Sequence, residues 1–233
     1  MLKYNGNNIK KVYKNKDIVK KIYKNSNVVF EYQNTLLPQG YQECKYIQTT
    51  GTEYIKTDFK PSDYNGNYTV VLDFQGVELL TASSYMCGCG SPRSCNVRVA
   101  TSGGLVIYNN NMSDSGATTA VSMTDAETDI LNRNKYKIIL RNEDITTLKT
   151  KGQTYSEEVV SKTASTSDFV IGRSSGTNYP IKIYGCKLYD ENDNLVRNFV
   201  PCLDDNNVPC MYEYITQQTF YNTGTGTFLY ELL

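Results

Sequence analysis

Short runs of alternating apolar and polar residues, separated by turn-forming residues, fill most of the chain. This period-two pattern is typical of strands with one buried face. The clearest run, residues 68–74, places four large side chains on one side, which we expect to point inward: Tyr68, Val70, Leu72 and Phe74. Similar runs cover 43–48, 53–57, 85–89, 97–100, 105–108, 136–140, 145–148, 156–160, 169–173, 181–189 and 195–200. Helical periodicity is absent, so the pattern predicts an all-β protein of about twelve to fourteen strands in a two-sheet antiparallel sandwich.

The run at 181–189 (IKIYGCKLY) has mixed faces. Strict alternation places Ile181, Ile183, Gly185 and Lys187 on one side, and the other side then holds Lys182, Tyr184, Cys186 and Leu188. A polar turn at 190–194 and a strand at 195–200 follow. We expect Pro201 to end that strand, because proline has no donor for the ladder. Residues 109–128 are polar and predict a long surface loop with one weak strand.

Residues 1–33 repeat a different pattern. Residues 10–19 (KKVYKNKDIV) precede 20–29 (KKIYKNSNVV), with six of ten positions identical, and 4–9 (YNGNNI) form a weaker copy. Each copy combines about six strand-forming residues with a turn of about four, which predicts a small N-terminal β-meander. Lysines fall on both of its faces, so this unit cannot bury much apolar surface alone. We therefore expect it to need a partner.

Charge is also uneven along the chain. Residues 1–33 hold eight lysines and two acids, a net charge of +6, and the whole chain is neutral. Such asymmetry favours contact with an acidic surface, although a solvated lysine-rich face has the same composition. We expect residues 1–33 to attach the chain to itself, as a homodimer or homotrimer, or to another protein, and not to nucleic acid. The residues expected to do so are Lys10, Lys11, Val12, Tyr13, Lys20, Lys21, Ile22 and Tyr23.

Composition excludes several kinds of chemistry. The chain has 20 tyrosines but no histidine or tryptophan. The lack of histidine excludes Ser-His-Asp and Cys-His catalysis and most zinc sites that contain histidine. The N-terminus lacks the apolar segment of a signal peptide, so the seven cysteines are expected to be free, buried thiols. No stretch approaches the roughly 18 apolar residues of a membrane-spanning helix, and we expect no membrane insertion.

Two segments carry a resemblance to a known family. Residues 46–57 (YIQTTGTEYIKT) resemble the opening of LamG-like, concanavalin A-type jelly-roll domains of phage and prophage virion proteins. Residues 182–228, with KIYGCKLYD, LVRNFVPC and FYNTGTGTF, resemble the closing segment, and FVIGR at 169–173 fits the strand before it. The resemblance covers roughly residues 38–233 and implies a fold, not an activity. We therefore expect a β-repeat at 1–33, a linker at 34–40 and a jelly-roll domain at 41–233.

The resemblance also implies a function. It implies a virion structural protein of head- or tail-fibre type, similar to those of crAss-like phages and located in the virion. Such a protein would attach to a capsid or tail protein through residues 1–33 and display the jelly roll, with possible contact to a host-surface glycan. The alternative is a carbohydrate-binding adhesin module whose lectin activity is its main function.

The chain offers candidate residues for glycan binding. Sugars are held by aromatic faces and by a few placed polar groups, and tyrosine can replace tryptophan in this role. Tyr108, Asn109, Asn110 and Tyr179 lie at predicted strand-to-loop transitions, where such a site could form. The competing interpretation is that most tyrosines simply pack in strands, where aromatic residues are favoured.

Three other kinds of site fit the sequence less well. A glycosidase needs two carboxylates facing each other, but neighbours on a strand such as Glu157 and Glu158 point to opposite faces. Asp204 and Asp205 fall in a predicted turn. Residues 190–194 offer oxygen ligands for Ca²⁺ but read more simply as a hairpin turn. Three close cysteines, at 87, 89 and 95, lack a fourth zinc ligand. We expect no enzyme activity, no metal and no cofactor.

Overall fold

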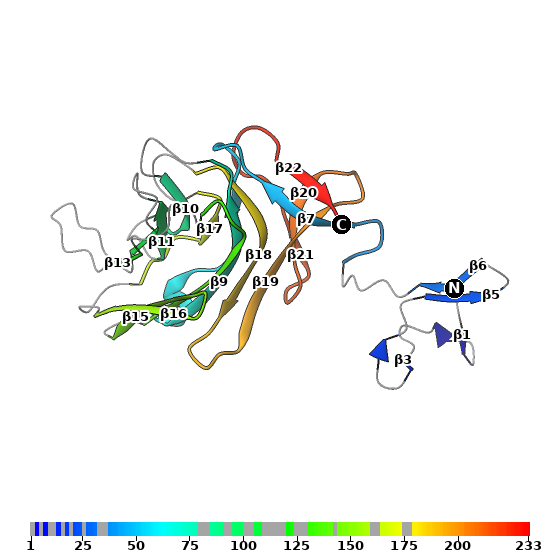
Figure 1. The fold of residues 1–233 in the computed structure, drawn as a ribbon, viewed down its shortest axis with the longest axis horizontal. Helices are drawn as coiled ribbons and strands as arrows, with labels where there is room; N and C mark the ends of the chain where they lie inside the picture. Colours follow the sequence, from blue (N-terminus) through cyan, green and yellow to red (C-terminus); the bar gives the residue numbers. More distant parts are fainter. Residues whose placement is uncertain are drawn as a thin grey trace. The chain divides into compact units, whose positions relative to one another are not determined.

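The structure, a computed structural model, describes residues 37–78, 84–90, 95–99, 105–108, 130–141, 144–158, 164–173 and 179–233. It also describes the backbone of short strands between residues 3 and 31 and of residues 120–123. The chain divides into two compact units, Met1–Leu36 and Leu37–Leu233 (Figure 1).

The described strands of the first unit form three β-hairpins, one for each copy of the repeat. They are β1 (Lys3–Tyr4) with β2 (Asn7–Asn8), β3 (Tyr13–Lys14) with β4 (Asp17–Ile18), and β5 (Lys21–Lys24) with β6 (Asn27–Glu31). Two residues separate the strands of each pair, which is the shortest common hairpin connection. Among the described strands, each copy therefore folds on itself and does not add one strand to a continuous meander. Of the residues expected to attach the chain, Lys10, Lys11, Val12 and Lys20 lie outside the described residues.

The second unit is a sandwich of two antiparallel sheets, as predicted (Figure 1). The small sheet contains β8 (Ile55–Lys56), β10 (Ser84–Gly88), β11 (Asn96–Val99), β12 (Leu105–Tyr108), β13 (Ala120–Met123) and β17 (Val170–Ile171). The large sheet contains β7 (Gln42–Gln48), β9 (Tyr68–Gly76), β14 (Asn134–Leu140), β15 (Ile145–Thr150), β16 (Gln153–Glu158), β18 (Ile181–Tyr189), β19 (Leu195–Leu203), β20 (Pro209–Glu213), β21 (Gln218–Phe220) and β22 (Leu229–Leu232). One 3₁₀ helix spans Pro61–Tyr64. The jelly-roll fold class is confirmed.

The core lies between the two sheets. The predicted inward side of β9 is confirmed, because Tyr68, Val70, Leu72 and Phe74 are all buried. The small sheet contributes buried side chains to the same cluster: Met86, Val97, Val99, Leu105, Ile107 and Ile171. Burial of each large apolar side chain contributes about 1.5–3 kcal/mol. The alternating pattern of β9 therefore shows which side of this strand faces the core and which side points away from it.

The two segments that carry the family resemblance are in contact. Thr223 N donates to Tyr54 O at 2.9 Å, and Thr52 Oγ1 donates to Thr225 O at 2.9 Å. Asn222 Oδ1 accepts from Tyr54 N at 3.1 Å. The last strand, β22, pairs antiparallel with the first strand of the unit, β7. These bonds join the beginning and the end of the second unit.

The prediction that Pro201 ends its strand is wrong. Strand β19 continues through Pro201, which is buried and faces Met211 of β20. On its other side, the partner of β19 changes at this point: Phe199 pairs with β18 and Cys202 pairs with β7. Because no pairing on that side requires a donor from residue 201, proline is tolerated inside the strand.

Candidate functional site

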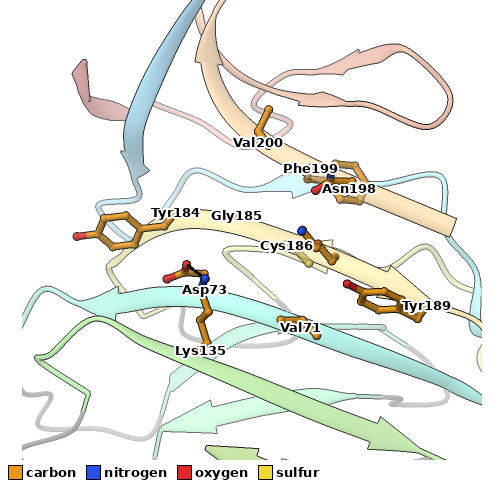
Figure 2. Close-up of a pocket in the computed structure, with 11 residues that line it drawn as sticks. Val71, Asp73, Lys135, Tyr184, Gly185, Cys186, Tyr189, Asn198, Phe199 and Val200 are labelled. Atoms are coloured by element: carbon orange, nitrogen blue, oxygen red, sulfur yellow. Dashed lines mark ion pairs between the residues drawn. The ribbon is translucent and has the colours of Figure 1, made fainter. Parts of the chain in front are cut away.

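The outer face of the large sheet, which points away from the core, contains a hollow of about 300 Å³. Its lining comes from four strands, β9, β14, β18 and β19: Val71, Asp73, Lys135, Tyr184, Gly185, Cys186, Lys187, Tyr189, Asn198, Phe199 and Val200. Figure 2 shows Tyr184 and Tyr189 toward opposite ends along β18. Asp73 and Lys135 lie on one side of β18, and Asn198 and Val200 on the other.

A β-bulge in β18 produces the hollow. Ile183 faces Phe74 but Gly185 faces Asp73, so two residues of β18 oppose one residue of β9. The bulge moves Cys186 and Leu188 to the core side, together with Ile181 and Ile183. The strict alternation expected for this strand is therefore wrong beyond Tyr184. Gly185 has no side chain, and the floor of the hollow at that position is bare backbone.

The one carboxylate among the described lining residues is held by cations. Asp73 accepts two bonds from Arg133, Nε to Oδ1 and Nη2 to Oδ2, both at 2.9 Å. Lys135 Nζ lies 3.5 Å from Asp73 Oδ2. The hydrogen bonds that Arg133 donates to Asp73 raise the pKa of its guanidinium. A two-pronged bond of this kind fixes both partners in place, so Asp73 forms a rigid wall of the hollow.

The aromatic ring of Tyr184 is also fixed. The Arg133 guanidinium carbon lies 4.0 Å from the centre of this ring, a cation–π contact. The Tyr184 hydroxyl donates to Gln75 Oε1 at 2.8 Å, and the ring of Tyr46 meets it edge-on at 5.5 Å. Three neighbours therefore set the ring orientation before any ligand arrives.

Asn198 has a polar atom without a partner. Two hydrogen bonds hold its backbone: its N donates to Glu213 Oε1 at 2.7 Å, and its O accepts from Tyr214 N at 3.1 Å. Its side-chain oxygen, Oδ1, is buried and accepts no hydrogen bond from the described residues. A buried acceptor left unpaired costs about 1–3 kcal/mol. A donor from a ligand in the hollow would remove that cost.

The candidates named from the sequence lie elsewhere. Tyr179 is fully buried and its hydroxyl donates to Glu78 O, so its ring is a core component and is not available to a glycan. Burial raises its pKa to about 12. Tyr108 is half-buried at the end of β12 in the small sheet, with the Arg98 guanidinium 5.5 Å from its ring centre. Asn109 and Asn110 lie outside the described residues. The structure does not bring Tyr108 or Tyr179 to the hollow.

The metal alternatives gain no support from the part of the chain that the structure describes. All seven cysteines are buried and free, and no group of three or more Cys, Asp or Glu side chains there is placed to hold a metal. Burial raises the pKa of Cys87 to about 12, so this thiol stays protonated. Asp190 accepts bonds from Asn192 N and from two groups of Asn194, which closes the hairpin turn at 190–194.

The acid pairs considered from the sequence are not arranged as a catalytic pair. Glu157 and Glu158 are exposed neighbours on β16, on opposite faces. Asp204 is buried and accepts from Asn206 N, Val208 N and the Tyr221 hydroxyl, so its carboxylate holds a turn together.

No protein-family profile and no curated protein matches the sequence. Among solved structures, the chain is similar to a heptameric SAP-like pentraxin of Limulus polyphemus, with 11% identity over 82% of this chain and 94% of that chain and a TM-score of 0.49. It is also similar to the CBM40 of the Ruminococcus gnavus IT-sialidase, solved bound to α2,3-sialyllactose, with 13% identity over 67% and 92% and a TM-score of 0.47.

A third similar structure is the mouse laminin α1 chain, domains LG4-5, with 9% identity over 67% of this chain and a TM-score of 0.45. The match covers 41% of that laminin chain, less than half of its length. At identities of 9–13% and TM-scores below 0.5, these similarities do not show what this chain binds. In the part of the chain that the structure describes, no helix has the length and apolarity needed to cross a membrane.

Proposed function

We propose that the second unit is a carbohydrate-binding module that holds a sugar in the hollow on the outer face of the large sheet. The observation that carries this proposal is that Asn198 lines the hollow and that its buried Oδ1 accepts no hydrogen bond from the described residues. A sugar hydroxyl is a donor of the right kind for it. The volume of about 300 Å³ lies at the lower end of the range of about 300–1,000 Å³ for ligand pockets.

The rigidity of the lining supports the same proposal. Arg133 fixes both the Asp73 carboxylate and the Tyr184 ring, and Glu213 fixes the Asn198 backbone. A preformed site loses little conformational entropy on binding. Glycosidases use two carboxylates about 5–10 Å apart. The described lining has only Asp73, which Arg133 already holds, so the proposal is one of binding and not of cleavage.

Alanine at Asn198 or at Tyr184 is expected to weaken glycan binding about tenfold, the effect of losing one hydrogen bond or one ring contact. The measurement is retention of labelled protein on a glycan array, followed by affinity for the best ligand. Tyr108→Ala, on the small sheet, is the matched control and should bind as the wild type does. Melting temperatures confirm that the variants are folded. Loss of binding only in Tyr108→Ala, or no glycan retained by the wild type, would contradict the proposal.

A second proposal concerns the first unit. We propose that residues 1–36 attach the carbohydrate-binding unit to a partner or to a second copy. The supporting observation is that these residues form a compact unit of their own, with one hairpin per repeat copy. The virion setting remains a prediction, because none of the structures named above is a virion protein.

Light scattering on the full chain and on a chain beginning at Leu37 tests this role. The full chain is expected to be a dimer or trimer and the shortened chain a folded monomer, because removing residues 1–36 removes the interface. If both chains are monomers, the partner is a different protein, and a search for it follows. Two oligomers of the same order would place the interface in the second unit and overturn the assignment.

A further inference from the structure

Three lysines lie in one row across the outer face of the large sheet. The strand register places Lys149 of β15 opposite Lys137 of β14, and Lys137 opposite Val71 of β9. Val71 lies opposite Lys187 of β18, which lies opposite Asn198 of β19. The neighbouring positions Ile138, Leu148 and Leu188 are buried in the core, so the lysines point outward. Neighbouring strands are about 4.8 Å apart, and the row spans about 19 Å.

A second hollow continues the first along this row. It also measures about 300 Å³ and is lined by Val71, Lys135, Lys137, Lys149, Thr150, Lys151, Gly152, Gln153 and Thr154. Val71 and Lys135 line both hollows, so the two adjoin. Together they form one groove across six strands, β16, β15, β14, β9, β18 and β19. One end of the groove contains Asn198, and the other end is lined by lysines.

The described residues neutralise the positive charge of this groove only in part. Like charges directly opposite each other on paired strands are destabilising, and Lys137 and Lys149 are such a pair. Asp193 Oδ1 lies 3.9 Å from Lys137 Nζ. Neither Lys149 nor Lys187 forms an ion pair with a carboxylate of the described residues.

The groove also contrasts with the unit that contains it. Residues 37–233 hold 16 basic and 22 acidic residues, a net charge of −6. The groove is therefore positively charged although the unit as a whole is negatively charged. Such a surface attracts a negatively charged ligand. Single-stranded nucleic acids stack successive bases on several aromatic rings, whereas the described lining has two tyrosines, Tyr184 and Tyr189, toward opposite ends of the first hollow (Figure 2). The ligand chemistry that fits is a sugar chain bearing anionic groups.

We propose that the groove binds an acidic glycan, with one sugar beside Asn198 and carboxylate or sulfate groups paired with Lys187, Lys137 and Lys149. The inference rests on the carbohydrate-binding role proposed above and names the class of its ligand. The lysine row then selects among glycans, because a neutral sugar chain leaves Lys149 and Lys187 without an ionic partner among the described residues.

The test compares the affinity of the full chain for polygalacturonate, heparin and neutral dextran by calorimetry, at about 50 and about 300 mM NaCl. Either acidic polymer, carboxylated or sulfated, is expected to bind, and the comparison shows which anionic group is preferred. Binding should weaken at the higher salt concentration. In the triple variant Lys137→Gln, Lys149→Gln, Lys187→Gln, affinity should fall about 30-fold or more, because three charge-assisted contacts are lost. This variant should melt no lower than the wild type, since a like-charge pair is removed.

A matched control has the same change of charge outside the groove: Lys45→Gln, Lys56→Gln, Lys60→Gln. None of these lysines lines either hollow, and the control should bind within about twofold of the wild type. Equal affinity in the wild type and the groove variant would overturn the inference. So would equally tight binding of a single-stranded oligonucleotide of matched charge. Binding of neutral dextran that depends on Asn198 but not on the lysines would leave the carbohydrate-binding role standing and refute the acidic ligand alone.

Discussion

Alanine in place of Gly224 is expected to lower the free energy of unfolding by about 3 kcal/mol, the upper range for overpacking a close contact. A Cβ atom there would lie 1.9 Å from Thr52 O and 2.9 Å from a ring carbon of Tyr54. The nearest atom belongs to the backbone, so no side-chain rotation relieves the clash. The 221–228 segment would have to move off residues 52–54, and the hydrogen bonds that join the two ends of the unit would break.

Urea unfolding of the purified variants measures this effect. Gly90→Ala is the control, because among the described residues a Cβ there would meet only Ser167 Oγ, at 3.9 Å. The control is expected to change the free energy of unfolding by no more than about 0.5 kcal/mol. A Gly224→Ala variant as stable as the Gly90→Ala variant would show that the closing contacts do not hold the unit together.

Loss of the Glu213 carboxylate is expected to destabilise the second unit by about 3 kcal/mol, because four hydrogen bonds to a buried, charged acceptor are lost. Glu213 is fully buried and accepts from Asn198 N, Ile215 N, and both the N and Oγ1 of Thr216, at 2.6 to 2.8 Å. The hydrogen bond from Asn198 N to Glu213 holds the backbone of Asn198 in place. The Glu213→Ala variant should therefore bind glycan more weakly even under conditions where it remains folded.

Thermal unfolding together with glycan affinity tests this prediction. The control is Glu231→Ala, which removes an exposed carboxylate paired with Lys45 and should change stability little. If Glu213→Ala loses stability but binds glycan with wild-type affinity, Asn198 does not depend on Glu213 for its position. If the Glu213→Ala variant keeps both its stability and its glycan affinity, the hydrogen bonds to Glu213 contribute measurably to neither.

The sequence predicted the sandwich because the alternating pattern in β9 determines which face is buried. The same reasoning failed in β18, where an extra residue at the bulge reverses the two faces after Tyr184. Alternation of residues gives no sign of such an insertion; only the pairing of Gly185 with Asp73 reveals it. Because the hollow lies over this bulge, its existence could not be predicted from the sequence pattern.

The candidate site was missed for a related reason. Tyr108 and Tyr179 were candidates because they lie at predicted strand-to-loop transitions. The hollow is instead lined by residues within strands, such as Tyr184 and Asn198. These residues are far apart in sequence from Asp73 and Lys135, and only the strand register brings them together. The lysine row has the same origin. Each lysine alone is an ordinary exposed strand residue, and the alignment of Lys149, Lys137 and Lys187 follows from pairing.

A chemical-shift titration of the isotope-labelled protein with a soluble oligogalacturonate tests whether the outer face of the large sheet binds carbohydrate. The amide signals that move most are expected to belong to Asp73, Lys135, Gly185 and Asn198, with smaller shifts at Lys137 and Lys149. Signals of the small sheet, including Tyr108, should remain in place. Shifts concentrated around Tyr108, or no shift at any lining residue of the two hollows, would refute carbohydrate binding on this face.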